Sequence, residues 1–162
     1  MKNIHKDILL QKLIEQAEAE LKLIAQAAQN TYEIATHEEN KPENEYDTRG
    51  LEASYLAGAQ AERVNEMKDV IIIWKSLKIK PFSKTDVIAL TALVECQIDG
   101  KSHEVFILPK GGGEKIQFEG HTLHVVTPES PLGEALIGLK VGDIAYLNVG
   151  GHEKEYEIMD VR

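Results

Sequence analysis

The hydrophobic positions in the first part of the chain recur at the spacing of an α-helix. Between Asn3 and His37 there is neither glycine nor proline. Apolar residues return there at intervals of three and four: Leu10, Leu13, Ala17, Leu21, Ile24 and Ala28. This stripe is close to the seam of a coiled coil. A helix of this length extends ~50 Å, too far for a small domain to cover, so the stripe predicts a partner helix.

A second helical pattern follows, from Pro42 to about Leu77. Its apolar positions are again three or four residues apart: Val64, Met67, Ile71 and Trp74. Between the two patterns lies Asn-Lys-Pro at positions 40–42. The residue before a proline avoids the helical region, and proline suits the first position of a new helix. So short a connection predicts an antiparallel helical hairpin.

Beyond Pro81 the hydrophobic period changes from 3.6 to 2, which predicts strands. We expect strands at residues 87–94, 103–108, 115–118, 122–127, 144–149 and 155–161, with turns at residues 99–100 and 150–151. Ser130-Pro131 opens a short helix that ends at Gly138. The predicted fold class is α+β. An antiparallel helical hairpin at residues 1–79 precedes a small, mostly antiparallel β-sheet domain at residues 80–162.

Composition and charge exclude several classes of protein. The 162 residues carry a net charge of −9, so a basic platform for nucleic acid is not expected. The one cysteine, Cys96, excludes a disulfide within the chain and is interpreted as a core residue. The N-terminus does not have the pattern of a signal peptide, and no apolar run has the length of a membrane span. We therefore expect a cytoplasmic protein.

Two further patterns do not predict chemistry. His121 and His124 are three residues apart, so on a strand they point to opposite faces, and no third ligand stands nearby for zinc. The glycines at positions 111–113 lack the Lys-Ser/Thr that follows a phosphate-binding loop. We expect a flexible loop there.

Residues 36–49, here called the acidic tip, form the one constellation with a specific chemical use. The acids between positions 33 and 47 are Glu33, Glu38, Glu39, Glu43, Glu45 and Asp47. Acids after Pro42 are equally explained by the positive end of a helix dipole, whereas those before it stand at a helix C-terminus, where negative charge is unfavourable. Exposed carboxylates hold Mg²⁺ or orient water, but these are too few to hold the metal alone.

The segment from residue 130 to 161 resembles the signature of the GreA/GreB family of bacterial transcript-cleavage factors. The likeness lies in Ser130-Pro131-Leu132-Gly133, Ala135-Leu136-Ile137-Gly138, Val141-Gly142-Asp143 and Glu155-Tyr156-Glu157-Ile158. Residues 43–63 also resemble the tip and the glycine-containing helix of that family. The resemblance implies a coiled coil that enters the secondary channel of bacterial RNA polymerase. It also implies an FKBP-like domain that docks at the channel's rim.

The resemblance further implies an accessory factor rather than an enzyme. Acids of the tip help the polymerase to hold its second Mg²⁺ and to activate water, so that backtracked RNA is cut. Glu39 and Glu43 are expected to share this Mg²⁺, with Glu38 and Glu45 beside them and Tyr46 next to the RNA end. No cofactor is expected on the chain alone. The implied partners are the polymerase and the 3′ end of the nascent RNA, with DNA contacted only through the elongation complex.

The acidic tip departs from the family pattern, in which an Asp is followed three residues later by a Glu and then by Asn-Ala-Glu-Tyr. Aligned without a gap on Glu45-Tyr46, the Asp position falls on Glu39 and the Glu position on Pro42. With a gap of one residue, Glu43 is kept and Asn40 replaces the Asp. A regulator that occupies the channel without cleavage is therefore the alternative. A prolyl isomerase or chaperone is less favoured, because the C-terminal half has few aromatic residues for a proline pocket.

Overall fold

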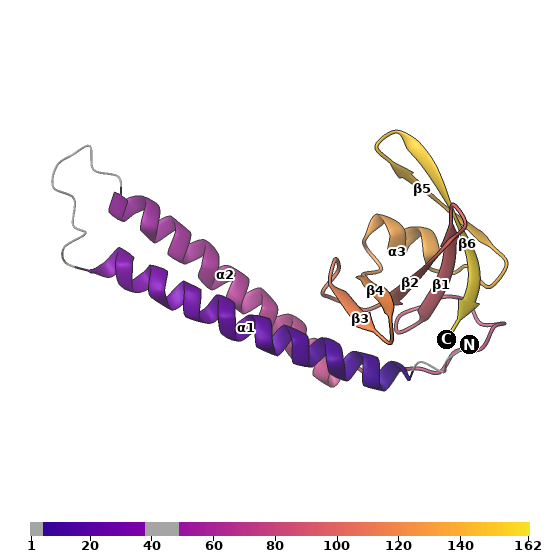
Figure 1. The fold of residues 1–162 in the computed structure, drawn as a ribbon, viewed down its shortest axis with the longest axis horizontal. Coiled ribbons are helices and arrows are strands. Elements are labelled where there is room, and N and C mark those ends of the chain that lie inside the picture. The colour runs from indigo at the N-terminus through magenta and orange to yellow at the C-terminus, as the bar shows by residue number, and fades with distance from the viewer. Residues whose placement is uncertain (1–4, 38–48) are drawn as a thin grey trace. The chain divides into compact units, whose positions relative to one another are not determined.

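Two long helices and a six-stranded sheet make up the computed structural model, which describes residues 5–37 and 49–162 (Figure 1). The elements are α1 (Lys6–Thr36), α2 (Arg49–Ser76), β1 (Leu93–Ile98), β2 (Lys101–Ile107), β3 (Lys115–Phe118), β4 (His121–Val126), α3 (Pro131–Leu136), β5 (Ile144–Val149) and β6 (His152–Val161). The predicted α+β class, with a helical hairpin first and a sheet with one short helix after it, is confirmed. The likeness of the sheet domain to FKBP stays a prediction.

The contacts between residues divide the chain into two units. Residues 11–75 form the hairpin unit, and Ser76–Arg162 form the sheet unit together with the described residues up to Leu10. The division into domains at residues 1–79 and 80–162 stays a prediction. No helix within residues 5–37 or 49–162 is both long and apolar enough to cross a membrane.

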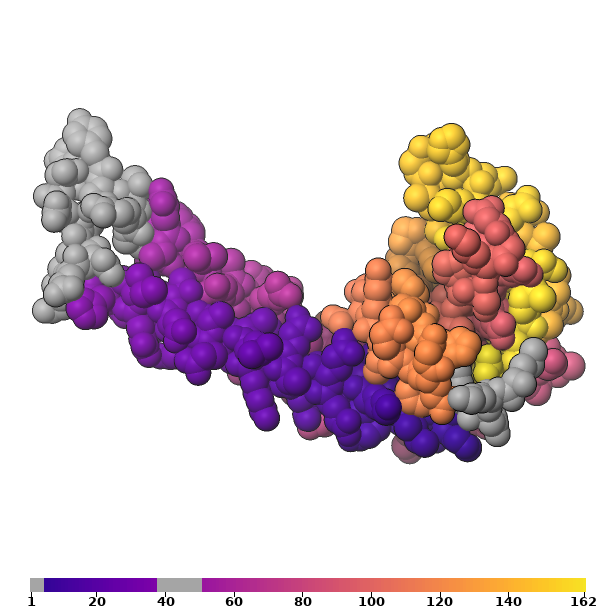
Figure 2. All heavy atoms as spheres, in the orientation of Figure 1, coloured from indigo at the N-terminus to yellow at the C-terminus, as the bar shows by residue number. Residues whose placement is uncertain are grey.

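In the hairpin unit, α1 and α2 lie side by side and run in opposite directions (Figures 1 and 2). The predicted stripe is buried at Leu13 and Ala17, and Val64 is buried on the facing helix. Two exposed ion pairs also join the helices: Arg63 to Glu20 at 3.2 Å and Lys75 to Glu18 at 2.6 Å. Exposed pairs contribute only ~0–1 kcal/mol each, so apolar packing holds the hairpin together. The second predicted helix is confirmed from Arg49, and residues 42–48 lie outside the described ranges.

The sheet has the strand order β3-β4-β2-β1-β6-β5. Every neighbouring pair is antiparallel except β2 and β4, which are parallel, with Val105 opposite His124. The sheet is therefore mostly antiparallel, as predicted, with one parallel pair. The hairpin of β3 and β4 joins β2 through its second strand. Period-2 alternation predicts that a segment is a strand but does not determine which neighbour it pairs with.

The strand predicted at residues 87–94 is wrong for all but its last two residues. Thr91 has φ +71°, which a strand does not allow and a β-branched residue rarely adopts. Instead, Ile88 exchanges main-chain hydrogen bonds with the segment after α3: its N–H donates to Leu139 and its carbonyl accepts from Gly138. The apolar run is thus a loop that is buried at Ile88, Thr91 and Ala92. Buried loops and buried strands are equally apolar, so hydrophobicity alone did not separate them.

The main core of the sheet unit lies between the sheet and α3. Val94, Cys96, Val105 and Ile158 from three strands meet Leu136 of the helix there. Ser130 caps α3 as predicted, because its Oγ accepts from the N–H of Gly133 at 3.1 Å. A Cβ on Gly133 would lie 1.9 Å from the carbonyl oxygen of Thr127. Only glycine therefore allows α3 to approach this loop so closely.

Lys6 ties the first turn of α1 to the sheet unit. Its ammonium donates to the main-chain oxygens of Lys80, Thr91 at 2.9 Å and Arg162 at 3.0 Å. It also lies 4.6 Å from the centre of the Phe82 ring, within the range of a cation–π interaction. Burial lowers the pKa of Lys6 to about 8, and the neighbouring Asp7 opposes this shift. One side chain thereby contacts three separate stretches of the sheet unit, at residues 80–82, 91 and 162.

Candidate functional site

The residues predicted to carry the chemistry lie outside the described ranges. Glu38, Glu39, Glu43, Glu45 and Tyr46 all fall within residues 38–48. Their roles, and the Mg²⁺ that Glu39 and Glu43 are expected to share, stay predictions. The structure does describe the two helices that lead to this segment, and the sheet unit.

The end of α1 that precedes the acidic tip carries no positively charged side chain in its last turn. The negative end of the helix dipole therefore adds to the acids that follow. Thr36 closes this helix by donating its hydroxyl to the carbonyl of Tyr32 at 2.9 Å. At 31 and 28 residues, α1 and α2 extend roughly 45 and 40 Å. The acidic tip is thus carried on a long arm.

The part of the arm next to the acidic tip exposes several large apolar side chains. The exposed residues of this kind in residues 30–37 and 51–60 are Tyr32, Ile34, Leu51, Tyr55 and Leu56. Exposed apolar side chains that gather in one region of a soluble protein commonly mark contact with another macromolecule. This end of the hairpin therefore has an exposed apolar surface that is available for contact with another macromolecule.

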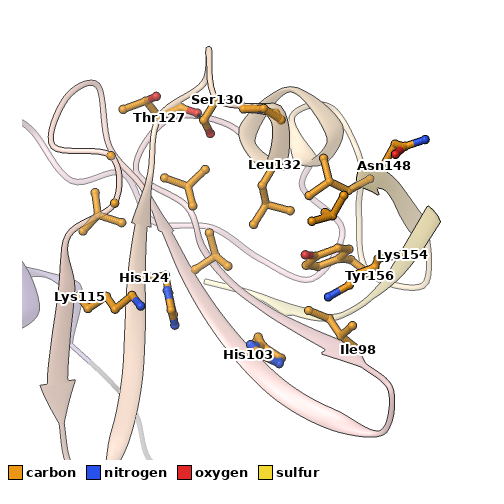
Figure 3. Close-up of a pocket in the computed structure, with 18 of the residues that line it drawn as sticks. Ile98, His103, Lys115, His124, Thr127, Ser130, Leu132, Asn148, Lys154 and Tyr156 are labelled. Atoms are coloured by element: carbon orange, nitrogen blue, oxygen red, sulfur yellow. Dashed lines mark hydrogen bonds between the residues drawn. The ribbon is translucent and has the colours of Figure 1, made fainter. Parts of the chain in front are cut away.

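The sheet unit has a cavity of about 1040 Å³ on the face that α3 covers (Figure 3). Apolar side chains from five strands and α3 line it: Ile98, Val105, Val126, Leu132, Leu147 and Tyr156. Three lysines and two histidines also line it: Lys101, Lys115, Lys154, His103 and His124. Asp99 is the one acidic residue among its lining. The cavity thus combines an apolar floor with a basic rim, although the whole chain is acidic.

His121 and His124 point to opposite faces of the sheet, as predicted. His124 lines the cavity, whereas Nδ1 of His121 lies 3.9 Å from a carboxylate oxygen of Glu104 on the other face. Among the described residues, no group of three histidines, cysteines or acids is arranged to hold a metal ion. The glycines at 112 and 113 line the cavity.

On the face of the sheet opposite the cavity, acids gather around one arginine. The guanidinium of Arg162 lies 2.9 Å from Asp160, 3.3 Å from Glu95 and 3.8 Å from Glu104. Glu104 is buried, and one of its carboxylate oxygens has no hydrogen-bond partner among the described residues. Burial raises the pKa of Glu104, while the charges of His121 and Arg162 oppose the shift. The cluster thus brings three acids within 4 Å of one guanidinium.

Cys96 is a core residue, as predicted. Its side chain is buried on β1, and its Sγ lies 3.5 Å from the carbonyl oxygen of His103 on the neighbouring strand. Burial, and then the charge of Glu95, raise the pKa of the thiol to about 11. Since the thiolate is the reactive form, this cysteine is inert at neutral pH.

The basic rim of the cavity was missed by sequence reasoning. Its cations are spread over residues 101–154 and come from β2, β3, β4 and β6, so they meet only once the strand pairing is known. Lys115 and His124, for example, are partners across β3 and β4. A useful signal would have been the presence of basic residues at alternate strand positions within an acidic chain.

Comparison with known proteins places this fold in a family. Residues 83–162 match the family model described as the C-terminal part of the transcription elongation factors GreA/GreB. The chain is 25% identical over 121 residues to transcription elongation factor GreA of Clostridium perfringens. The aligned region covers 74% of this chain and 70% of that protein. It is 24% identical over 152 residues to transcription inhibitor protein Gfh1 of Thermus aquaticus. Here the aligned region covers 93% of this chain and 90% of that protein.

The crystal structure of Thermus aquaticus Gfh1 aligns with 94% of this chain and 91% of its own, at 24% identity and a TM-score of 0.39. The family predicted from the C-terminal signature is confirmed by the match of the family model. Through residues 83–162, the chain belongs to the GreA/GreB family of transcription elongation factors.

Proposed function

We propose that the chain is a secondary-channel factor of bacterial RNA polymerase that stimulates cleavage of backtracked RNA. The observation that carries this proposal is the match of residues 83–162 to the GreA/GreB family. The relatives are named as a transcription elongation factor and a transcription inhibitor. The chain acts as an accessory factor, and the polymerase supplies the catalytic site.

The hairpin unit supports this proposal through its dimensions and its surface. An arm roughly 40 Å long carries the acidic tip away from the hairpin's base. Carboxylates at the end of such an arm reach a buried active site only along a channel. Exposed apolar residues such as Tyr32 and Tyr55 then face the channel wall.

Within the polymerase, the acidic tip completes a metal site that it cannot build alone. Glu39 and Glu43 share the second Mg²⁺ with acids of the polymerase, because Mg²⁺ takes oxygen ligands from more than one source. A Mg²⁺ ion held there by Glu39 and Glu43 together with the polymerase would supply the activation of water for RNA cleavage. Glu38 and Glu45 add negative charge beside the metal, and Tyr46 packs against the RNA 3′ end.

Cleavage of a stalled, backtracked elongation complex tests this proposal. The wild-type protein should speed release of a short 3′ RNA fragment, and Glu39→Ala with Glu43→Ala should abolish that gain. The matched control is Glu62→Ala with Glu66→Ala, which removes two exposed acids from α2 and changes the net charge equally. An equal loss of cleavage in both double variants would contradict the metal-site roles.

Binding to the polymerase is measured separately from cleavage. Neutralising the acidic tip should weaken cleavage more than it weakens binding, because the sheet unit keeps its own contacts with the polymerase. The protein should also compete with other secondary-channel factors for core polymerase, with marked salt dependence. A failure to bind purified core polymerase at low salt would refute the whole proposal.

A second function, inhibition of transcription without cleavage, is favoured by one observation. The relative named as an inhibitor covers 93% of this chain, and the GreA relative covers 74%. In the same assay, an inhibitor slows RNA extension and leaves the rate of cleavage unchanged. Prolyl isomerisation is supported less, because the cavity lining contains a single Phe, Tyr or Trp side chain, that of Tyr156. An isomerisation assay on a proline peptide tests this function.

A further inference from the structure

The sheet ends at β5, whose one neighbouring strand among the described residues is β6 (Figure 1). An edge strand presents unpaired main-chain groups, and proteins usually protect it with a lysine, a proline or a bulge. Strand β5 has the sequence IAYLNV, with no charged residue and no proline, and its register with β6 is continuous. The other edge strand, β3, is four residues long and begins with Lys115. Strand β5 is thus the less protected edge.

Three residues of β5 direct their main-chain groups away from β6. In an antiparallel pair, residues that hydrogen-bond to the partner strand alternate with residues whose N–H and carbonyl point outward. Just before β5, the carbonyl of Asp143 accepts from the N–H of Ile158 on β6, so the odd-numbered positions face β6. The outward groups, here called the open edge, belong to Ile144, Tyr146 and Asn148. The side chains of Ile144 and Tyr146 are 40% and 54% exposed, so the open edge is accessible.

The strand behind the open edge carries a row of acids. Directly opposite Ile144, Tyr146 and Asn148 lie Glu157, Glu155 and Glu153 of β6, here called the acidic row. Residues opposite one another in an antiparallel pair have their side chains on the same face of the sheet. All three acids are exposed, and none forms an ion pair with a basic side chain in the described part of the chain. An uncharged edge is thus backed by negative charge.

A groove of about 720 Å³ runs along the acidic row toward β1. Its lining contains the three acids of the row together with Asp99, and two basic side chains, Lys154 and His152. A cleft lined mainly by one sign of charge concentrates ligands of the opposite sign. A chain that lies along β5 is therefore expected to carry positive charge.

We propose that the open edge of β5 binds an extended, basic segment of a partner protein, which adds to the sheet as a further strand. Main-chain hydrogen bonds to the outward groups of β5 hold the segment. Lysines or arginines at its alternate positions stand on the same face as the acidic row. Their long side chains pass over the ring of Tyr146, where a cation is favoured, toward the carboxylates. This docking edge uses neither the acidic tip nor the cavity, and does not depend on the proposed function.

Charge also disfavours the other occupants of such an edge. A second copy of this chain would offer its own β5, which has no basic residue, and would bring a second acidic row to the same sheet. Like charges on neighbouring strands destabilise their pairing. Nucleic acid is disfavoured because its phosphates are negative. The complementary partner is thus a basic polypeptide segment.

Three synthetic peptides with blocked ends test the inference on the full chain. The probe is Lys-Val-Lys-Val-Lys-Val-Lys, which alternates as a strand does. In Lys-Pro-Lys-Pro-Lys-Pro-Lys the charge is the same, but proline removes main-chain donors and opposes strand pairing. The third peptide, Glu-Val-Glu-Val-Glu-Val-Glu, keeps the strand pattern and reverses the charge.

Calorimetric titration measures the binding of each peptide. One Lys-Val peptide should bind per chain, more weakly as salt is added. The Lys-Pro peptide should bind at least about tenfold more weakly, because it loses main-chain hydrogen bonds, and the Glu-Val peptide should not bind. Equal binding of the Lys-Pro and Lys-Val peptides would show that charge alone holds them, and would overturn the addition of a strand.

Variants separate the open edge from the acidic row. Tyr146→Pro removes an outward donor and should weaken binding of the Lys-Val peptide about tenfold, whereas Tyr146→Thr keeps the donor and should weaken it less. Glu155→Gln with Glu157→Gln should weaken binding roughly threefold to tenfold, the usual effect of losing two exposed charge partners. The charge-matched control is Glu62→Gln with Glu66→Gln, two exposed acids on α2. An equal loss in this control would show that the effect is long-range charge, and would refute the site.

Nuclear magnetic resonance of the wild-type protein locates the peptide without any substitution. Chemical-shift changes on adding the Lys-Val peptide should centre on residues 144, 146 and 148, and the amides there should exchange more slowly with solvent. Shifts centred on the cavity residues 103 and 124 would refute the docking edge. Self-association of the chain through β5, without binding of the Lys-Val peptide, would refute the basic occupant.

Discussion

Replacing Gly133 by alanine tests how tightly α3 is held against the sheet unit. The new Cβ would lie 1.9 Å from the carbonyl oxygen and 2.8 Å from the carbonyl carbon of Thr127. Both neighbours are main-chain atoms, so the helix has to move by at least ~1 Å to restore an ordinary contact. This movement disturbs the hydroxyl of Ser130, which accepts from Gly133 and donates to Thr127 at 2.7 Å. It also shifts Leu136, which is fully buried.

The magnitude follows from three contributions. Overpacking of this kind costs about 1–3 kcal/mol. Loss of the Ser130 cap costs about 1 kcal/mol more. The better helix propensity of alanine returns at most ~1 kcal/mol. We therefore expect Gly133→Ala to reduce the free energy of unfolding of the sheet unit by about 2 kcal/mol.

Amide hydrogen exchange, resolved by peptide, measures this change within the sheet unit. Peptides that cover residues 123–138 should lose protection in Gly133→Ala. The matched control is Gly58→Ala on α2, where nothing lies within 4 Å of the new Cβ, so the hairpin should be stabilised by up to ~1 kcal/mol. If the free energy of opening from hydrogen exchange differs by less than about 0.5 kcal/mol between Gly133→Ala and wild type, the close approach of α3 does not constrain the fold.

Three further outcomes follow from single side chains. Glu104→Gln should stabilise the protein at pH 7 in urea unfolding. The pKa of Glu104 is raised in the fold, so ionising its carboxyl costs stability as the pH rises above the ordinary pKa of 4.5. The stability gained by Glu104→Gln should therefore shrink as the pH falls toward 4.5. A gain that grows at low pH would contradict this reasoning. Cys96 should resist a thiol reagent in the native protein at pH 8 and react in denaturant, since burial raises its pKa to about 11; fast native labelling would contradict its burial. Arg63→Ala should change stability by less than ~1 kcal/mol, because its pair with Glu20 is exposed, and a larger loss in thermal melts would show that the pair carries the hairpin.

Sequence reasoning succeeded where periodicity and turn residues agreed. The strands at 115–118 and 144–149 were predicted with the bounds that the structure has, because glycine or polar turns flank them. It failed at residues 87–92, because a continuous apolar run has no period and φ +71° at Thr91 depends on its buried surroundings. Neither the parallel pairing of β2 with β4 nor the basic cavity was predictable, since both depend on which strands become neighbours. The metal-site roles of Glu39 and Glu43 remain predictions.

The bonds of Lys6 set an order on folding during protein synthesis. Lys6 is translated 156 residues before Arg162, which is one of its acceptors. Strand β6, which pairs with β1, is also made after all the other strands of the sheet. The helices α1 and α2 are close in sequence, so they can pair while the sheet unit is still incomplete. The hairpin of α1 and α2 can therefore form first. During that time the ammonium of Lys6, in the first turn of α1, stays hydrated because its acceptor Arg162 has not yet been translated.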